Sequence, residues 1–125
     1  MDMRVNTLPL TLGGETYELR CNFAVLADVD FSYGGVKKAL NAGSFFCALT
    51  FMTAMVNDSL RRRGSDKRYT TEEVSALVDG GYNGSAVDLA NAVNGLVFSA
   101  VLGDLPAADN SDDNTAPAEG GTSKN

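Results

Sequence analysis

Few side chains in this chain of 125 residues are of the types that catalyse reactions or bind metal ions. The chain has no histidine, which excludes histidine-based acid–base catalysis and histidine metal ligands. Its two cysteines, Cys21 and Cys47, are too few for a four-thiolate zinc site within one chain. We expect both thiols to be buried and unpaired, with a disulfide or a reactive thiol as the alternative.

The carboxylates do not form a recognisable catalytic or metal site. Asp28 and Asp30 are two residues apart on a predicted helix, so they point to different faces. Asp109, Asp112 and Asp113 have the composition of a calcium loop without its spacing or its final glutamate. The motifs of phosphate-binding loops and of nucleophile elbows do not occur. We therefore expect a protein that is not an enzyme and that uses no cofactor or metal.

The basic residues gather in one cluster, in which Lys67 and Arg68 follow Arg61, Arg62 and Arg63. The three arginines are candidate partner-binding residues that contact an acidic surface or nucleic-acid phosphates. The alternative is positive charge that favours the C-terminal end of a helix dipole, followed by a solvated loop. Nucleic acid is not the expected partner, because the net charge of −6 repels phosphate.

Phe51, Met52 and Met55 form the second candidate partner-binding group. Flexible thioethers beside an aromatic ring can repack around varied partners, as in an adaptable docking surface. The alternative is that all three belong to the core, which a chain of this length needs in order to fold. The sequence leaves both interpretations open.

The elements that position these groups begin with a hairpin. Leu8–Leu12 and Thr16–Arg20 alternate between apolar and polar residues on either side of Gly13-Gly14, which predicts a β-hairpin. Pro9 cannot donate a ladder hydrogen bond and indicates an edge strand. Because an isolated hairpin is marginally stable in water, we expect its leucine face to pack on helices.

Apolar spacing and capping residues predict five helices after the hairpin. They run from Asn22 to about 32, over 36–41, from Ser44 to about 63, from Thr70 to about 79, and from Ser85 to 102. Glycines 34, 35, 80, 81 and 84 are interpreted as helix stops, with hinges as the alternative. The predicted stripes are Phe23, Leu26, Ala27 and Asp30 in the first helix, with Val25 and Val29 beside it; Phe45, Leu49, Met52, Val56 and Leu60 in the third, as a core stripe; and Val87, Ala90, Val93 or Asn94, Val97 and Val101 in the last. The third helix has a second apolar face, which indicates a central helix or one half-covered by a partner.

The predicted fold class is mainly α, a small helical bundle with an N-terminal β-hairpin packed on it. Residues 1–103 are expected to form this domain, and residues 104–125, with five acids and one base, a disordered acidic tail. No apolar run approaches the roughly 18 residues that span a membrane. No apolar leader precedes the hairpin, so neither membrane insertion nor secretion is expected.

The order of these motifs resembles the tail assembly chaperones of long-tailed bacteriophages and gene transfer agents. The resemblance covers residues 8–102 and is carried by Leu10-Thr-Leu-Gly-Gly-Glu-Thr-Tyr-Glu-Leu-Arg20, Asn22-Phe-Ala-Val-Leu-Ala27 and Thr70-Thr-Glu-Glu-Val74. Many members have Glu-Glu after the Leu-Ala helix, where this chain has Asp28-Val29-Asp30. No catalytic residues transfer, because the family has none.

The resemblance implies a protein of the host cytoplasm that binds the tape-measure protein, assists tail-tube assembly and is absent from the mature virion. It implies a longer form made by programmed frameshifting, through which tail tube protein is recruited. Ser123-Lys124-Asn125 can be encoded by a slippery run, which gives the hypothesis of a frameshift site there; the alternative is chance, because Lys-Asn is an ordinary dipeptide. A homo-oligomer is an additional expectation. The alternatives are a small structural tail or connector protein and, less favoured, a regulatory DNA-binding domain.

Overall fold

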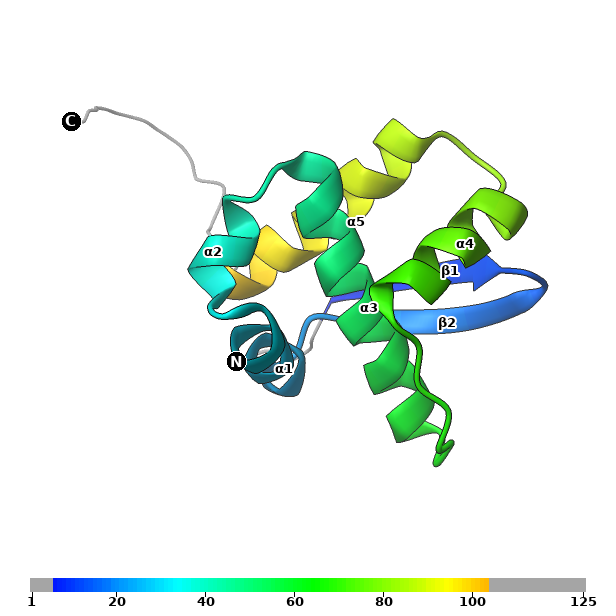
Figure 1. Ribbon diagram of the computed structural model, residues 1–125, viewed down its shortest axis with the longest axis horizontal. Coiled ribbons are helices and arrows are strands. Elements are labelled where there is room, and N and C mark those ends of the chain that lie inside the picture. The colour runs from blue at the N-terminus through cyan, green and yellow to red at the C-terminus, as the bar shows by residue number, and fades with distance from the viewer. Residues whose placement is uncertain (1–5, 104–125) are drawn as a thin grey trace.

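A computed structural model describes residues 6–103, so the predicted tail and the frameshift site lie outside the described part (Figure 1). The elements are β1 (Thr7–Leu12), β2 (Glu15–Arg20), α1 (Phe23–Tyr33), α2 (Val36–Leu40), α3 (Ser44–Arg62), α4 (Thr71–Gly81) and α5 (Ala86–Leu102). The predicted fold class is confirmed: the chain is mainly α-helical, with one antiparallel hairpin packed on the helices. Among residues 6–103, no helix is both long and apolar enough to cross a membrane.

The hairpin turns at Gly13 and Gly14, whose φ angles of 58° and 84° are those that a two-residue turn of this kind demands. The register places Leu10 opposite Tyr17 and Leu8 opposite Leu19. Leu10, Tyr17 and Leu19 are buried, and their strand neighbours are exposed or partly exposed. The inner face of the hairpin therefore lies on the helices, as the alternation predicts.

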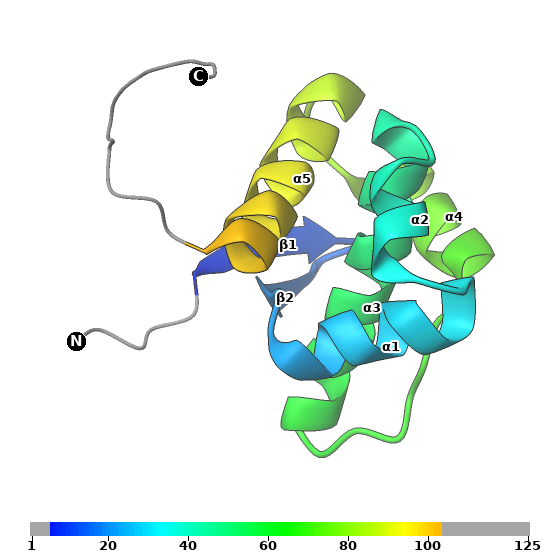
Figure 2. The ribbon, with the colours of Figure 1, turned by 90° about the vertical axis from the view of Figure 1, so that its left-hand side faces the viewer.

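Helix α3 is the centre of the fold. It packs against α1, α2, α4, α5 and β2, with α1 and α2 on one side and α4 on the other (Figure 1). The hairpin lies between α3 and α5 (Figure 2). Between Cys47 and Leu60 every residue of α3 is buried except Leu49 and Asn57, which are partly exposed. The two apolar faces thus belong to a central helix.

Most of the residues predicted to cap helix N-termini form the expected capping hydrogen bonds. The Asn22 side chain accepts from the Val25 N–H at 2.9 Å. Thr70 and Glu73 form the full capping box, and the Ser85 side chain accepts from Asp88 N–H. Ser44 is the exception, because Gly43 occupies the cap position with φ 108° and Ser44 is the first helical residue.

Three of the predicted stripes are wrong in part. On α1 the buried residues are Val25 and Val29, whereas Phe23 is 85% exposed and Phe31 is 91% exposed. Phe45 on α3 and Val87 on α5 are also exposed. Apolar residues occur nearly all round α1, so their spacing alone does not select the face that meets α3. The outcome leaves large apolar side chains on the surface.

Candidate docking surface

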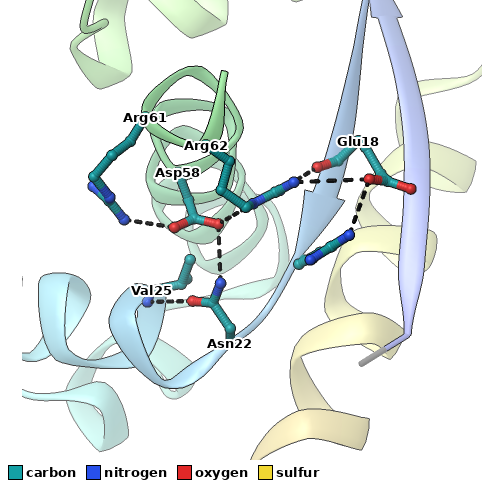
Figure 3. A network of polar contacts seen from close by, with 7 residues as sticks. Glu18, Asn22, Val25, Asp58, Arg61 and Arg62 are labelled. Atoms are coloured by element: carbon teal, nitrogen blue, oxygen red, sulfur yellow. Dashed lines mark hydrogen bonds and ion pairs between the residues drawn. The ribbon is translucent and has the colours of Figure 1, made fainter. Parts of the chain in front are cut away.

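The candidate arginines lie in the last turn of α3 and at its end, and they bind groups of the same chain. Arg61 and Arg62 both donate to the carboxylate of Asp58, with Arg62 Nε 2.9 Å from Oδ2 (Figure 3). Arg62 also donates to the Glu18 carbonyl at 2.7 Å, and its guanidinium lies 3.7 Å from the Glu18 carboxylate. The arginines therefore fasten the end of α3 to β2.

Arg63 extends this attachment toward the hairpin turn. It donates to the carboxylate of Glu15 and to the carbonyl of Thr16. Its guanidinium carbon also lies 5.1 Å from the centre of the Tyr17 ring, in a cation–π contact. The sequence did not reveal these partners, because they are 44 to 48 residues away in the chain.

Asp58 is ionised at the centre of this network. Burial disfavours its charged form, but hydrogen bonds from Arg62, Asn22 and Arg61 outweigh burial and hold the pKa of the carboxyl below its ordinary value. A buried carboxylate with three side-chain donors is a structural node. All three arginines therefore have partners within the chain, although their side chains remain 28% to 47% exposed.

The second candidate group is in the core, which is the alternative that the sequence left open. Phe51 and Met55 are fully buried and Met52 is 4% exposed, all in the central helix. They are thus unavailable as a surface in this structure. Met52 is also part of the lining of a groove that opens to solvent.

The aromatic residues on the surface are different ones. Of the six phenylalanines in the chain, Phe51 is the buried one. The other five are at least 41% exposed: Phe23, Phe31, Phe45, Phe46 and Phe98. Val87 and Leu102 add exposed aliphatic side chains on α5. Single exposed apolar residues are ordinary, so these five phenylalanines are candidate contact residues for a partner.

A groove opens between α3, α4 and α5 beside Phe45. Its volume is about 190 Å³, and its walls are mainly apolar. Each helix contributes residues: Phe45, Ala48, Leu49 and Met52 from α3; Ser75, Val78 and Asp79 from α4; and Ala86, Leu89 and Ala90 from α5. We call this the α3–α5 groove. Because these residues come from three separate helices, no single stretch of the sequence predicts the groove.

The position of α4 in this wall depends on Gly81. A Cβ atom at Gly81 would lie 2.5 Å from the Gly13 backbone nitrogen in the hairpin turn. The close approach of the two glycines lets the end of α4 rest on the turn, while the capping box begins its other end. This glycine is more than a helix stop, because its lack of a side chain sets where α4 lies.

A second, more polar hollow of about 390 Å³ lies between α1, α3 and the segment before α4. Hydroxyl groups line much of it, including those of Ser32, Thr53 and Tyr69. Phe46 lies at its edge, with its ring centre 5.4 Å from that of Tyr33. Asp28 is the charged residue of its lining, and the buried hydroxyl of Thr50, also in the lining, has no hydrogen-bond partner within residues 6–103.

The two thiols are buried and unpaired, as expected from the sequence. Burial raises the pKa of Cys21 to about 11, and the nearby Cys47 adds to this increase. Burial also raises the pKa of Cys47. Within residues 6–103 no group of three or more histidine, cysteine or acidic side chains could hold a metal ion.

Comparison with known proteins gives no match: no family model, no curated protein and no solved structure matches the chain. Function is therefore inferred from the exposed surface and from the resemblance of the motifs.

Proposed function

We propose that this protein is a phage tail assembly chaperone that binds the tape-measure protein and leaves before the virion is complete. The observation that carries the proposal is the exposure of five of the six phenylalanines around a central, well-buried helix. Those side chains are not needed for the core, so their apolar area is free to cover a client. The α3–α5 groove adds a place for a client side chain.

The physical mechanism is shielding. A long helical client with apolar stripes associates with itself when those stripes are exposed, and an apolar groove can cover a helix face. The exposed phenylalanines lie on α1, α3 and α5, so contacts are spread over several small areas. Contacts of this kind are individually weak, which lets the polymerising tail tube protein displace the chaperone. Recruitment of tube protein through a longer frameshift form is part of the same proposal.

The other interpretations make different predictions. A structural tail or connector protein would remain in purified particles, whereas a chaperone would not. A DNA-binding role has little support, because Arg61, Arg62 and Arg63 are bound to carboxylates and carbonyls of their own chain.

Co-expression with the tape-measure protein of the same gene cluster tests the proposal. We expect the full chain to keep the tape-measure protein soluble and to co-purify with it. Ala86→Phe, which fills the α3–α5 groove, should reduce this rescue. Ala92→Phe is the matched control, because Ala92 is exposed on the same helix and does not line the groove. No rescue by the unmodified chain, or presence of the protein in purified particles, would contradict the proposal.

A further inference from the structure

The charged residues of α4 and α5, two of the three helices that line the α3–α5 groove, are all acidic. Residues 71–102, which include α4 and α5, contain four carboxylates and no lysine or arginine. The carboxylates are Glu72, Glu73, Asp79 and Asp88. Asp79 belongs to the groove wall itself and is exposed. Among the described residues, neither Asp79 nor Asp88 forms an ion pair, so both carboxylates are available to a partner.

The charged residues of α1 are acidic as well. Phe23 and Phe31 share their helix with Asp28 and Asp30, and α1 contains no basic residue. The basic side chains of the described residues lie elsewhere, on α2, at the end of α3, in the loop after it and at Arg20. Negative charge therefore accompanies the exposed apolar residues of α1 and α5, whereas Phe46 packs on Tyr33, whose ring has Lys38 5.7 Å from its centre.

We propose that the α3–α5 groove binds an amphipathic helix of a partner protein that inserts one bulky apolar side chain and carries lysine or arginine beside it. This inference rests on the proposed function and specifies which part of the client is bound. The groove accepts the apolar side chain, and Asp79 in its wall pairs with a flanking cation.

The size of the groove fits this ligand. A cavity of about 150 Å³ holds a benzene ring, so the volume of about 190 Å³ accommodates a leucine, methionine or phenylalanine side chain. Apolar contact supplies affinity, and the carboxylates supply selection and orientation. Acidic helices with the same apolar stripe are rejected by like charge.

Charge also separates this occupant from two others that the chain itself could provide. Residues 104–125 contain five acids and one base, so the tail has the wrong sign for the groove. The α1 face of a second copy contains two aspartates and no base, so it is repelled as well. A basic amphipathic helix from a different protein satisfies both the apolar walls and the carboxylates.

Binding of synthetic peptides to the full-length protein tests this inference. The probes are three labelled helical peptides of about 18 residues, long enough to form a helix on binding. One has a leucine stripe flanked by lysines, the second has the same stripe flanked by glutamates, and the third is a scrambled lysine peptide without a stripe. Fluorescence anisotropy should show at least tenfold tighter binding of the first peptide than of either other at low salt. Its advantage over the glutamate peptide should shrink as salt is added.

Matched variants locate the site. Asp79→Asn should weaken the lysine peptide about two- to fivefold, the amount expected for one exposed ion pair, whereas Asp88→Asn, outside the groove lining, should weaken it less. Asp66→Asn is the control, because Asp66 is an exposed loop carboxylate that does not line the groove. Ala86→Phe should remove most of the binding, and Ala92→Phe should preserve it.

Three results would overturn the inference: equal binding of the lysine and glutamate peptides, equal effects of Asp79→Asn and Asp66→Asn, or a change of oligomeric state caused by Ala86→Phe. The last result would identify a second copy as the occupant. If the Asp79→Asn variant rescues the tape-measure protein as well as the unmodified chain does, the charge inference fails and the chaperone proposal stands. If the unmodified chain gives no rescue, the chaperone proposal fails by itself.

Discussion

The amide of Asn22 joins two helices through the carboxylate of Asp58. Asn22 Nδ2 donates to Asp58 Oδ2 at 3.0 Å, while Asn22 Oδ1 accepts from the Val25 N–H and caps α1 (Figure 3). Asp58 also accepts from Arg62, which in turn donates to the Glu18 carbonyl of β2. One buried carboxylate thus connects α1, α3 and the hairpin.

Removal of that carboxylate should destabilise the fold. Asp58→Ala leaves the donors of Asn22, Arg61 and Arg62 without their acceptor, which we expect to lower the free energy of unfolding by about 1–3 kcal/mol. Urea denaturation followed by circular dichroism measures the change. Asp66→Ala, at an exposed loop position, should stay within about 0.5 kcal/mol of the unmodified chain. Equal stability of the two variants would contradict the role of Asp58.

The same carboxylate should contribute to acid sensitivity. Its pKa is lowered in the folded state, so the unfolded chain takes up its proton first as the pH falls. The stabilisation is complete above the ordinary carboxyl pKa of about 4 and is lost as the pH falls through the lower folded pKa. Between about pH 7 and about pH 2, the free energy of unfolding of Asp58→Asn should therefore fall less steeply at the acid end than that of the unmodified chain. Parallel curves would show that other groups account for the acid response.

Two neighbouring glycines of α4 should respond in opposite ways. Gly81→Ala places a Cβ 2.5 Å from the Gly13 nitrogen and should cost about 1–3 kcal/mol of stability. Gly80→Ala meets no atom within 4 Å and should be neutral or stabilise the helix by up to about 1 kcal/mol. Thermal unfolding of both variants checks this difference. A Gly81→Ala protein as stable as Gly80→Ala would mean that the end of α4 does not rest on the hairpin turn.

The surface phenylalanines should be dispensable for stability. Phe23→Ser with Phe31→Ser removes exposed rings, so the free energy of unfolding should change by less than about 1 kcal/mol. Binding of an apolar dye and self-association should both decrease. By contrast, Phe51→Ala removes a fully buried ring and should cost about 3–5 kcal/mol. A large loss of stability in the double serine variant would show that α1 packs through its outer face.

The thiols should be unreactive until the protein unfolds. Cys21 and Cys47 are buried, and their raised pKa values keep the reactive thiolate scarce near neutral pH. A colorimetric thiol reagent should label neither residue in the native protein and both in urea. Fast labelling of either cysteine without denaturant would contradict their burial.

Local structure was predictable where neighbouring residues determine it. The Gly13-Gly14 turn, the Asn22 cap and the Thr70–Glu73 capping box all depend on groups within a few residues of one another. Their backbone angles and hydrogen bonds follow from residue type and order, so the sequence specifies them. For α3 the two apolar faces left a central helix and one half-covered by a partner both open, and packing on five other elements decided for the central position.

Other features were decided by contacts between distant segments. Periodicity in α1 shows which residues share a face, but only packing against α3 decided that Val25 turns inward and Phe23 outward. Arg62 and Arg63 bind groups of the hairpin that precede them by more than 40 residues, so no local sequence pattern predicts these contacts. The α3–α5 groove depends on the position of α4, whose C-terminal end packs against the hairpin turn where Gly81 meets Gly13. Sequence order determines short-range hydrogen bonds and helix spacing, whereas the surface left for a partner depends on how whole elements pack.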